Sequence, residues 1–118
     1  MSKFEDANSS GDLLGGRMIV RIGEREWIWD CPDDSLLAAI DHTFRRRLTR
    51  GDSVYFSSDA IPEIGRTWAT LVIPPSAFVS FSYTHHNGED FNALTHEVQE
   101  LVDRDGGLTV NADYQLIG

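Results

Sequence analysis

Two segments with the apolar period of an amphipathic helix, residues 34–50 and 89–104, constrain this chain most, because strand-like segments precede each of them and glycines follow. In both segments, apolar side chains recur every three or four residues, which gives a helix one buried face. These side chains are Leu36, Leu37, Ile40, Phe44 and Leu48 in the first segment, and Phe91, Leu94, Val98, Leu101 and Val102 in the second. We therefore expect two helices that pack on a common core.

Residues at both ends of these segments indicate where the helices start and stop. Asp33 follows Pro32 in an acidic run that supplies N-cap oxygens and negative charge, as a helix start requires. Gly51 and Gly106 are expected to end the two helices, since glycine readily adopts the left-handed conformation of a C-cap. The residues expected on the outer faces are His42, Arg45 and Arg46 in the first helix and His96 in the second.

The segments around the helices alternate apolar and polar residues, which is typical of half-buried antiparallel strands. Residues 18–22 and 27–29 are expected to form a hairpin around a turn at Gly23. Further strands are predicted at residues 52–58, 67–73, 78–84 and 108–110, and residues 114–117 could continue the last one. The sequence thus predicts an α+β fold of order ββαβββαβ, with a mostly antiparallel sheet and both helices packed on one face.

Composition favours a single domain that needs no cofactor. The chain has 118 residues, 41% of them hydrophobic, which suffices for one core without metals or disulfides. Residues 1–16 are polar and are predicted to form a flexible N-terminal tail, with the domain spanning residues 17–118. No phosphate-binding glycine motif and no nucleophile elbow is present, so we expect neither a cofactor nor an enzyme.

The same features predict a cytoplasmic protein. The start of the chain lacks the basic and apolar regions of a signal peptide, and no apolar run approaches the roughly 20 residues of a membrane helix. The one cysteine, Cys31, cannot form a disulfide within the chain. Its neighbours are acidic, so its thiolate should not be stabilised, and we interpret it as structural.

The formal net charge of −9 argues against general nucleic-acid binding, which depends on lysine and arginine contacts to phosphates. The charge is uneven, because residues 59–118 contain two arginines and nine carboxylates. An acidic decoy that occupies a nucleic-acid-binding protein is therefore one hypothesis for the function.

A loop with two histidines is the best candidate for chemistry. His85, His86 and Asp90 lie together in the sequence and could hold a divalent metal or act as a general acid and base. This would suit a small metal-assisted hydrolase. The simpler interpretation is a polar turn before an acidic helix start, because adjacent histidines on an extended chain point to opposite sides and no known ligand spacing is present.

A cluster of arginines near the end of the first helix is the second candidate. Arg45, Arg46, Arg47 and Arg50 could bind a phosphate or an acidic partner through forked hydrogen bonds. Alternatively, these cations complement the helix dipole, and Asp41 is placed to pair with Arg45.

Aromatic residues support the leading hypothesis, a non-enzymatic protein-interaction module. The chain has three tryptophans, Trp27 and Trp29 in the hairpin and Trp68. This excess of aromatic side chains, without a recognisable set of catalytic residues, is typical of a surface that binds protein. We expect them, or the open face of the sheet, to bind protein, with a homodimer as one form of the complex. The residues predicted to bind are Trp27, Trp29, Arg45, Arg46 and Arg50.

Residues 46–110 resemble a family of small actinobacterial proteins of unknown function. The similarity lies in residues 47–57 (RLTRGDSVYFS), in Gly65-Arg66-Thr67-Trp68 leading to residues 73–76 (IPPS), and in residues 106–110 (GGLTV). The resemblance implies a compact strand and helix domain. Similar proteins sometimes carry the label "ATP-dependent DNA ligase", which the sequence contradicts, because ligases use a lysine in a K-x-D-G motif and the only lysine here is Lys3.

Overall fold

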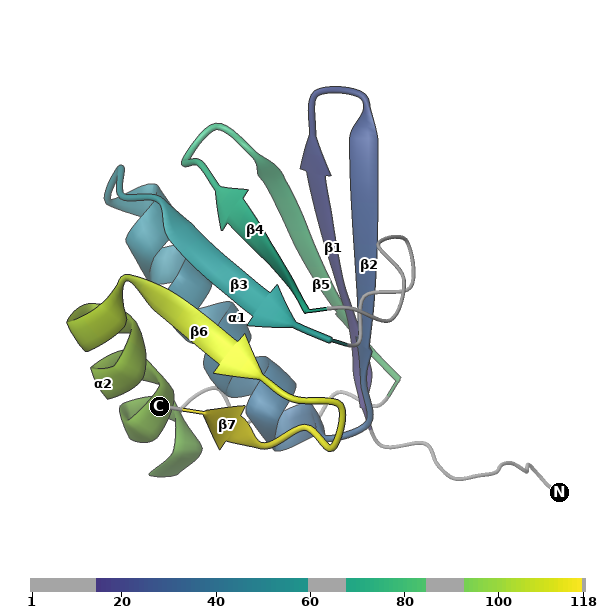
Figure 1. Cartoon of the computed structure of the whole chain (residues 1–118), viewed down its shortest axis with the longest axis vertical. Coiled ribbons are helices and arrows are strands. Elements are labelled where there is room, and N and C mark those ends of the chain that lie inside the picture. Colours follow the sequence, from purple (N-terminus) through teal and green to yellow (C-terminus); the bar gives the residue numbers. More distant parts are fainter. Residues whose placement is uncertain (1–14, 60–67, 85–92, 118) are drawn as a thin grey trace, which may run out of the picture.

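The protein is described by a computed structural model that covers residues 15–59, 68–84 and 93–117 (Figure 1). The elements are β1 (Gly16–Ile22), β2 (Arg25–Cys31), α1 (Asp34–Thr49), β3 (Val54–Ser58), β4 (Ala69–Ile73), β5 (Phe78–Tyr83), α2 (Ala93–Asp105), β6 (Gly107–Val110) and β7 (Leu116–Ile117). The predicted α+β class and the order ββαβββαβ are confirmed, and the short β7 follows as a hairpin with β6.

The strands form two hydrogen-bonded sheets, whereas the sequence led us to expect one. The three-stranded sheet has the order β2-β1-β5, and the four-stranded sheet has the order β4-β3-β6-β7. All pairs are antiparallel except β3 with β6. The division falls between β4 and β5, which a tight turn joins, with Ala77 N donating to Pro74 O at 3.0 Å. Pro74 and Pro75 have no N–H group, so they cannot extend a ladder between these strands.

Helix α1 holds the two sheets together. It contacts β1, β2 and β5 of one sheet and β3 of the other, and it runs behind the strands in Figure 1. The ring of Trp29, from β2, lies 4.8 Å from the ring of Phe56, from β3, and Phe44 of α1 is 6.2 Å from Phe56. Helix α2 packs against α1 and β6. Both sheets therefore share one core.

The helix ends follow the predicted capping. The side chain of Asp33 accepts hydrogen bonds from Ser35 N (3.0 Å) and Leu36 N (3.2 Å), so two free N–H groups at the start of α1 are satisfied. Gly51 and Gly106 have positive φ angles of 95° and 84°, as expected of residues that end helices in the left-handed conformation.

The domain begins slightly earlier than predicted. β1 already includes Gly16, and Gly15 is buried and accepts a hydrogen bond from Thr84 N at 2.7 Å. A side chain at Gly16 would collide with the backbone of Ser82, so close pairing with β5 requires glycine there. The rest of the predicted tail, residues 1–14, and the predicted start of the second helix at residues 89–92 lie outside the described residues.

Candidate functional site

The outward side of the four-stranded sheet has no charged side chain at any of its described strand positions. The strand register places the outward residues together, because side chains alternate between the two sides of a strand. We call this surface the open face, and it consists of Tyr55, Ser57, Thr70, Val72, Thr109 and Ile117. In Figure 1, α1 lies behind the strands, on the opposite side of the sheet.

Large apolar side chains are exposed on and beside the open face. Val72 is 66% exposed and Ile117 is 45% exposed. Trp68, which directly precedes β4, is 49% exposed. Ser57 and Thr70 occupy paired positions and share a hydrogen bond of 3.0 Å between their hydroxyl groups, so these polar atoms satisfy each other. The open face thus combines accessible apolar area with a pair of hydroxyl groups that are hydrogen-bonded to each other.

The outward side of the three-stranded sheet is different, because ion pairs cover it. Arg17 Nε lies 2.8 Å from Asp30 Oδ1, and Arg21 Nη2 lies 2.6 Å from Glu26 Oε2. The Arg21 guanidinium also lies 5.2 Å from the ring centre of exposed Phe78. This surface is well solvated, so we do not regard it as an apolar contact surface.

The tryptophans predicted to bind a partner occupy different environments, and the prediction for Trp29 is wrong. Trp29 is 2% exposed and packs on Phe56 and on Tyr114, whose ring centre is 5.8 Å away. It lies on the core side of the hairpin. Trp27 shares that side but is half-buried near the end of the hairpin, with the Arg25 guanidinium 5.1 Å from its ring centre. No partner can reach Trp29 in this fold.

The predicted arginines also differ from one another. Arg45 donates to Asp41 Oδ1 through Nε (3.1 Å) and Nη2 (2.6 Å), and Tyr83 donates to the other oxygen of the same carboxylate at 2.8 Å. Arg45 therefore belongs to the contact between α1 and β5, which agrees with the pairing expected from its spacing to Asp41. Arg50 pairs with Asp52 at 2.9 Å. The side chain of Arg46 forms no hydrogen bond or ion pair with the residues that the structure describes.

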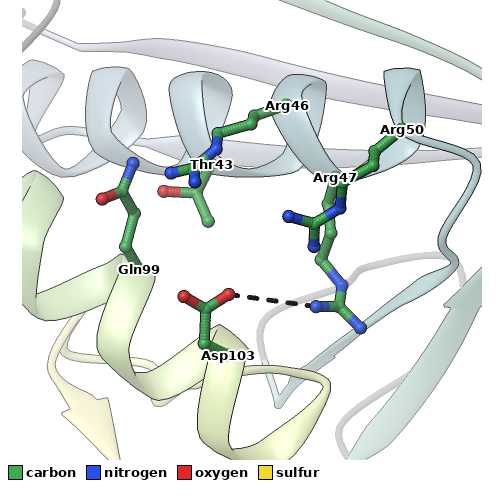
Figure 2. Close-up of a pocket in the computed structure, with 6 residues that line it drawn as sticks. All are labelled: Thr43, Arg46, Arg47, Arg50, Gln99 and Asp103. Carbon is green, nitrogen blue, oxygen red and sulfur yellow. Dashed lines mark ion pairs between the residues drawn. The ribbon is translucent and has the colours of Figure 1, made fainter.

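Arg46 and Arg50 line a groove between α1 and α2 (Figure 2). We call it the helix groove, and its lining residues are Thr43, Arg46, Arg47, Arg50, Gln99 and Asp103. Arg47 lies 4.0 Å from Asp103 across the groove and also donates to Ser53 O at 3.0 Å. Two buried atoms of the groove, Thr43 Oγ1 and Gln99 Nε2, have no hydrogen-bond partner among the described residues.

Sequence reasoning found the arginines of this groove but missed Thr43, Gln99 and Asp103. The missing information is the pairing of α1 with α2, which joins residues more than 50 positions apart. A partial signal exists, since Gln99 and Asp103 are four residues apart and so share one side of a helix, as do Thr43 and Arg47. Only the packing of the two helices shows that these sides meet.

Cys31 belongs to the hydrophobic core, which fits its interpretation as a structural residue. It is buried, and its thiol donates to the carbonyl of Asp33 at 3.3 Å. Burial, together with the nearby negative charges of Asp33 and Asp34, raises the pKa of Cys31 to about 12, although a hydrogen bond with the Asp33 backbone that favours the thiolate acts in the opposite direction. The thiolate needed for nucleophilic chemistry is therefore scarce at neutral pH.

The predicted metal loop, with His85, His86 and Asp90, lies outside the described residues. Within residues 15–59, 68–84 and 93–117, no group of three or more His, Cys, Asp and Glu side chains could hold a metal ion. In the same residues, no helix is long and apolar enough to cross a membrane.

Comparison with protein-family models, with curated proteins and with solved structures gives no match to this chain. The resemblance to the actinobacterial family therefore stays an expectation, and the function has to be inferred from the geometry.

Proposed function

We propose that this protein is a non-enzymatic protein-interaction module of the cytoplasm and that its open face is the surface that contacts the partner. The observation that carries this proposal is that an uncharged sheet surface has exposed apolar side chains at both of its edges, with Val72 on β4, Trp68 just before β4, and Ile117 on β7. The cores of protein interfaces are depleted of charge and enriched in aromatic residues in the same way.

The charge of the chain adds to this argument. The chain has a formal net charge of −9, and a surface that carries carboxylates must lose their hydration before it can contact another protein closely. The open face avoids this cost at its strand positions. Burial of apolar area there would contribute about 25 cal/mol per Å² before the costs of association are subtracted.

The proposed partner is a protein with a complementary apolar patch, and a second copy of this chain is the first one to test. Measuring the mass of the complex in solution distinguishes a homodimer from a complex with another protein. Either result agrees with an interaction module, whereas a complex formed through a different surface would contradict the assignment of the open face.

Site-specific photo-crosslinking in cells tests that assignment. A photoreactive phenylalanine analogue placed at Val72 should give a protein adduct of defined mass, and the same analogue at Asp30, on the charged side of the other sheet, should give much less. Adding Ile117→Glu to the Val72 probe should remove the adduct, because it places a charge in the interface.

Ser76→Glu is the matched control, since it adds the same charge at an exposed turn residue that is not part of the open face. This control should leave the adduct at Val72 unchanged. Equal crosslinking at Val72 and Asp30, or an adduct that persists with Ile117→Glu, would show that the open face is not the contact surface.

A further inference from the structure

The helix groove between α1 and α2 contains more hydrogen-bond donors than acceptors. Thr43 is 5% exposed, and its hydroxyl has no partner among the described residues. Gln99 Nε2, on the opposite wall, is also buried and unpaired. Burying such groups without hydrogen bonds is unfavourable, so each buried polar atom of this kind requires an explanation. One explanation is that a bound group supplies the missing acceptor.

The groove is narrow and open to solvent. The groove as a whole has a cavity volume of about 10 Å³, which is roughly the volume needed for one water-sized atom. Counted out to the open mouth, the empty volume is about 200 Å³. A group that projects a single oxygen inward therefore fits better than a flat ring or an apolar chain.

The side chains of Arg46 and Arg50 lie at the solvent-exposed opening of the helix groove. Figure 2 shows the Arg46 side chain running back along α1 so that its guanidinium lies beside Thr43 and faces Gln99 across the groove. Arg46 has no ion-pair partner in the described part of the chain, and Arg50 is only partly neutralised by Asp52 at the protein surface. Guanidinium groups bind phosphate oxygens with two parallel hydrogen bonds.

We propose that the helix groove binds a phosphate group, either as free inorganic phosphate or as the end of a small phosphomonoester. One phosphate oxygen accepts from Thr43 Oγ1 and Gln99 Nε2 at the floor, and the remaining oxygens accept from Arg46 and Arg50 at the mouth. A tetrahedral anion suits donors that converge from two helices, whereas a planar carboxylate has only two oxygens to offer. This inference is independent of the open face.

Asp103 sets the affinity of the site. Its carboxylate lies on the wall of the groove, 4.0 Å from Arg47, and repels an incoming anion. Replacing it by Asn removes this repulsion without changing the size of the side chain. Asp103→Asn should therefore tighten phosphate binding, while the loss of Arg46 should weaken it.

Calorimetric titration of the full-length protein tests the proposal, with inorganic phosphate, glycerol 3-phosphate and acetate as probes. We expect the two phosphates to bind more tightly than acetate, and their relative affinity distinguishes the free ion from a monoester. Arg46→Gln should weaken phosphate binding about tenfold or more, as expected for the loss of hydrogen bonds to a charged group. Arg45→Gln is the control and should change little, because Arg45 pairs with Asp41 outside the groove.

Thr43→Val separates a binding role from a structural one. The substitution keeps the shape of the side chain but removes the unpaired hydroxyl, so it should raise the Tm of the free protein and weaken phosphate binding several-fold. A merely structural threonine would not weaken binding. No phosphate binding at millimolar concentrations, or equal affinity in the wild type and Arg46→Gln, would overturn the proposal and leave a groove that holds only water.

Val72→Glu, on the open face, should leave phosphate binding unchanged. The proposal of a phosphate site and the proposal of a protein interface can therefore be refuted independently of each other.

Discussion

The chemistry of Cys31 depends on burial rather than on the reactivity that cysteine has in water. Its thiol lies in the core between β2 and α1 and donates to a backbone carbonyl. Burial is the largest cause of the rise of its pKa to about 12, from an ordinary value of 9.0. The folded protein therefore keeps the thiol proton at pH values where the unfolded chain has lost it.

We expect this residue to make folding stability depend on alkaline pH. Between pH 9 and pH 12 the unfolded state binds fewer protons than the folded state, so the free energy of unfolding falls as the pH rises. Below about pH 9 the contribution of Cys31 is fully present. Urea unfolding measured from pH 7 to pH 10.5 should show this fall in the wild type and a smaller one in Cys31→Ala. Identical slopes would mean that the thiol ionises equally in both states.

At the scale of elements, the apolar stripe of α1 lies where the sequence places it. Leu36, Leu37, Ile40 and Phe44 are buried, and Leu48 packs against the core from its edge. The polar side of this helix is less uniform than expected, since Arg45 and Arg46 are exposed but His42 is half-buried. Periodicity fixes which side chains share a face, and the neighbouring elements decide how far each one is covered.

Phe44→Ala should lower the free energy of unfolding by about 3 to 5 kcal/mol, because it removes a fully buried ring that contacts Phe56 and leaves a cavity. His96→Ala is the control on α2. His96 is exposed, so this change should stay within about 0.5 kcal/mol of the wild type. Chemical denaturation of both variants measures the difference. A histidine substitution as costly as the phenylalanine substitution would show that the helix faces are assigned the wrong way round.

The elements could be predicted better than their arrangement. Local signals sufficed for the helices, the Asp33 cap and most strands, because each depends on residues within a few positions of one another. The division into two sheets could not be read from the chain, since Pro74-Pro75 ends a strand without showing whether β4 and β5 pair. Alternation likewise shows that Trp27 and Trp29 share one side of the hairpin, but either side could have faced the core.

The site was predictable in part for the same reason. Spacing alone pairs Arg45 with Asp41 and leaves Arg46 without an obvious partner. The open face, by contrast, depends on the register of β3 with β4 and β6, and the helix groove depends on α1 meeting α2. Such contacts between distant parts of the chain are set by tertiary packing.

At the scale of the whole molecule, the two sheets should unfold together. Trp29 belongs to the three-stranded sheet, yet its ring packs 4.8 Å from Phe56 in the four-stranded sheet, and α1 contacts both sheets. A shared core of this kind favours a single cooperative transition. Thermal unfolding followed by far-UV circular dichroism and by tryptophan fluorescence should give the same Tm.

The fluorescence measurement is best made in Trp68→Phe, which removes the signal of an exposed tryptophan and leaves those of Trp27 and Trp29. Two separate transitions, with the fluorescence change at the lower temperature, would mean that the three-stranded sheet unfolds independently.

The hydrolase hypothesis gives a further test on the whole protein. If His85, His86 and Asp90 bind a metal, zinc or manganese should stabilise the folded state by about 2.7 kcal/mol at a hundredfold excess over the Kd, and His85→Ala/His86→Ala should remove the gain. We expect the Tm to be the same with and without metal and with chelator. A reproducible shift that the double variant abolishes would favour the hydrolase over the interaction module.

Salt dependence separates the interaction module from the acidic decoy. Charges on exposed surfaces are screened over about 10 Å at 0.1 M salt, so a decoy that binds through its carboxylates should lose affinity steeply as salt rises. The open face has no charge at its described strand positions, and a complex formed through Val72 and Ile117 should keep its Kd within about threefold between 50 and 500 mM NaCl, because apolar burial does not depend on screening. Titration of the captured partner at several salt concentrations measures this slope. Weakening by a hundredfold or more over the same range would contradict binding through the open face and support the decoy, in which the nine carboxylates of residues 59–118 make the contact.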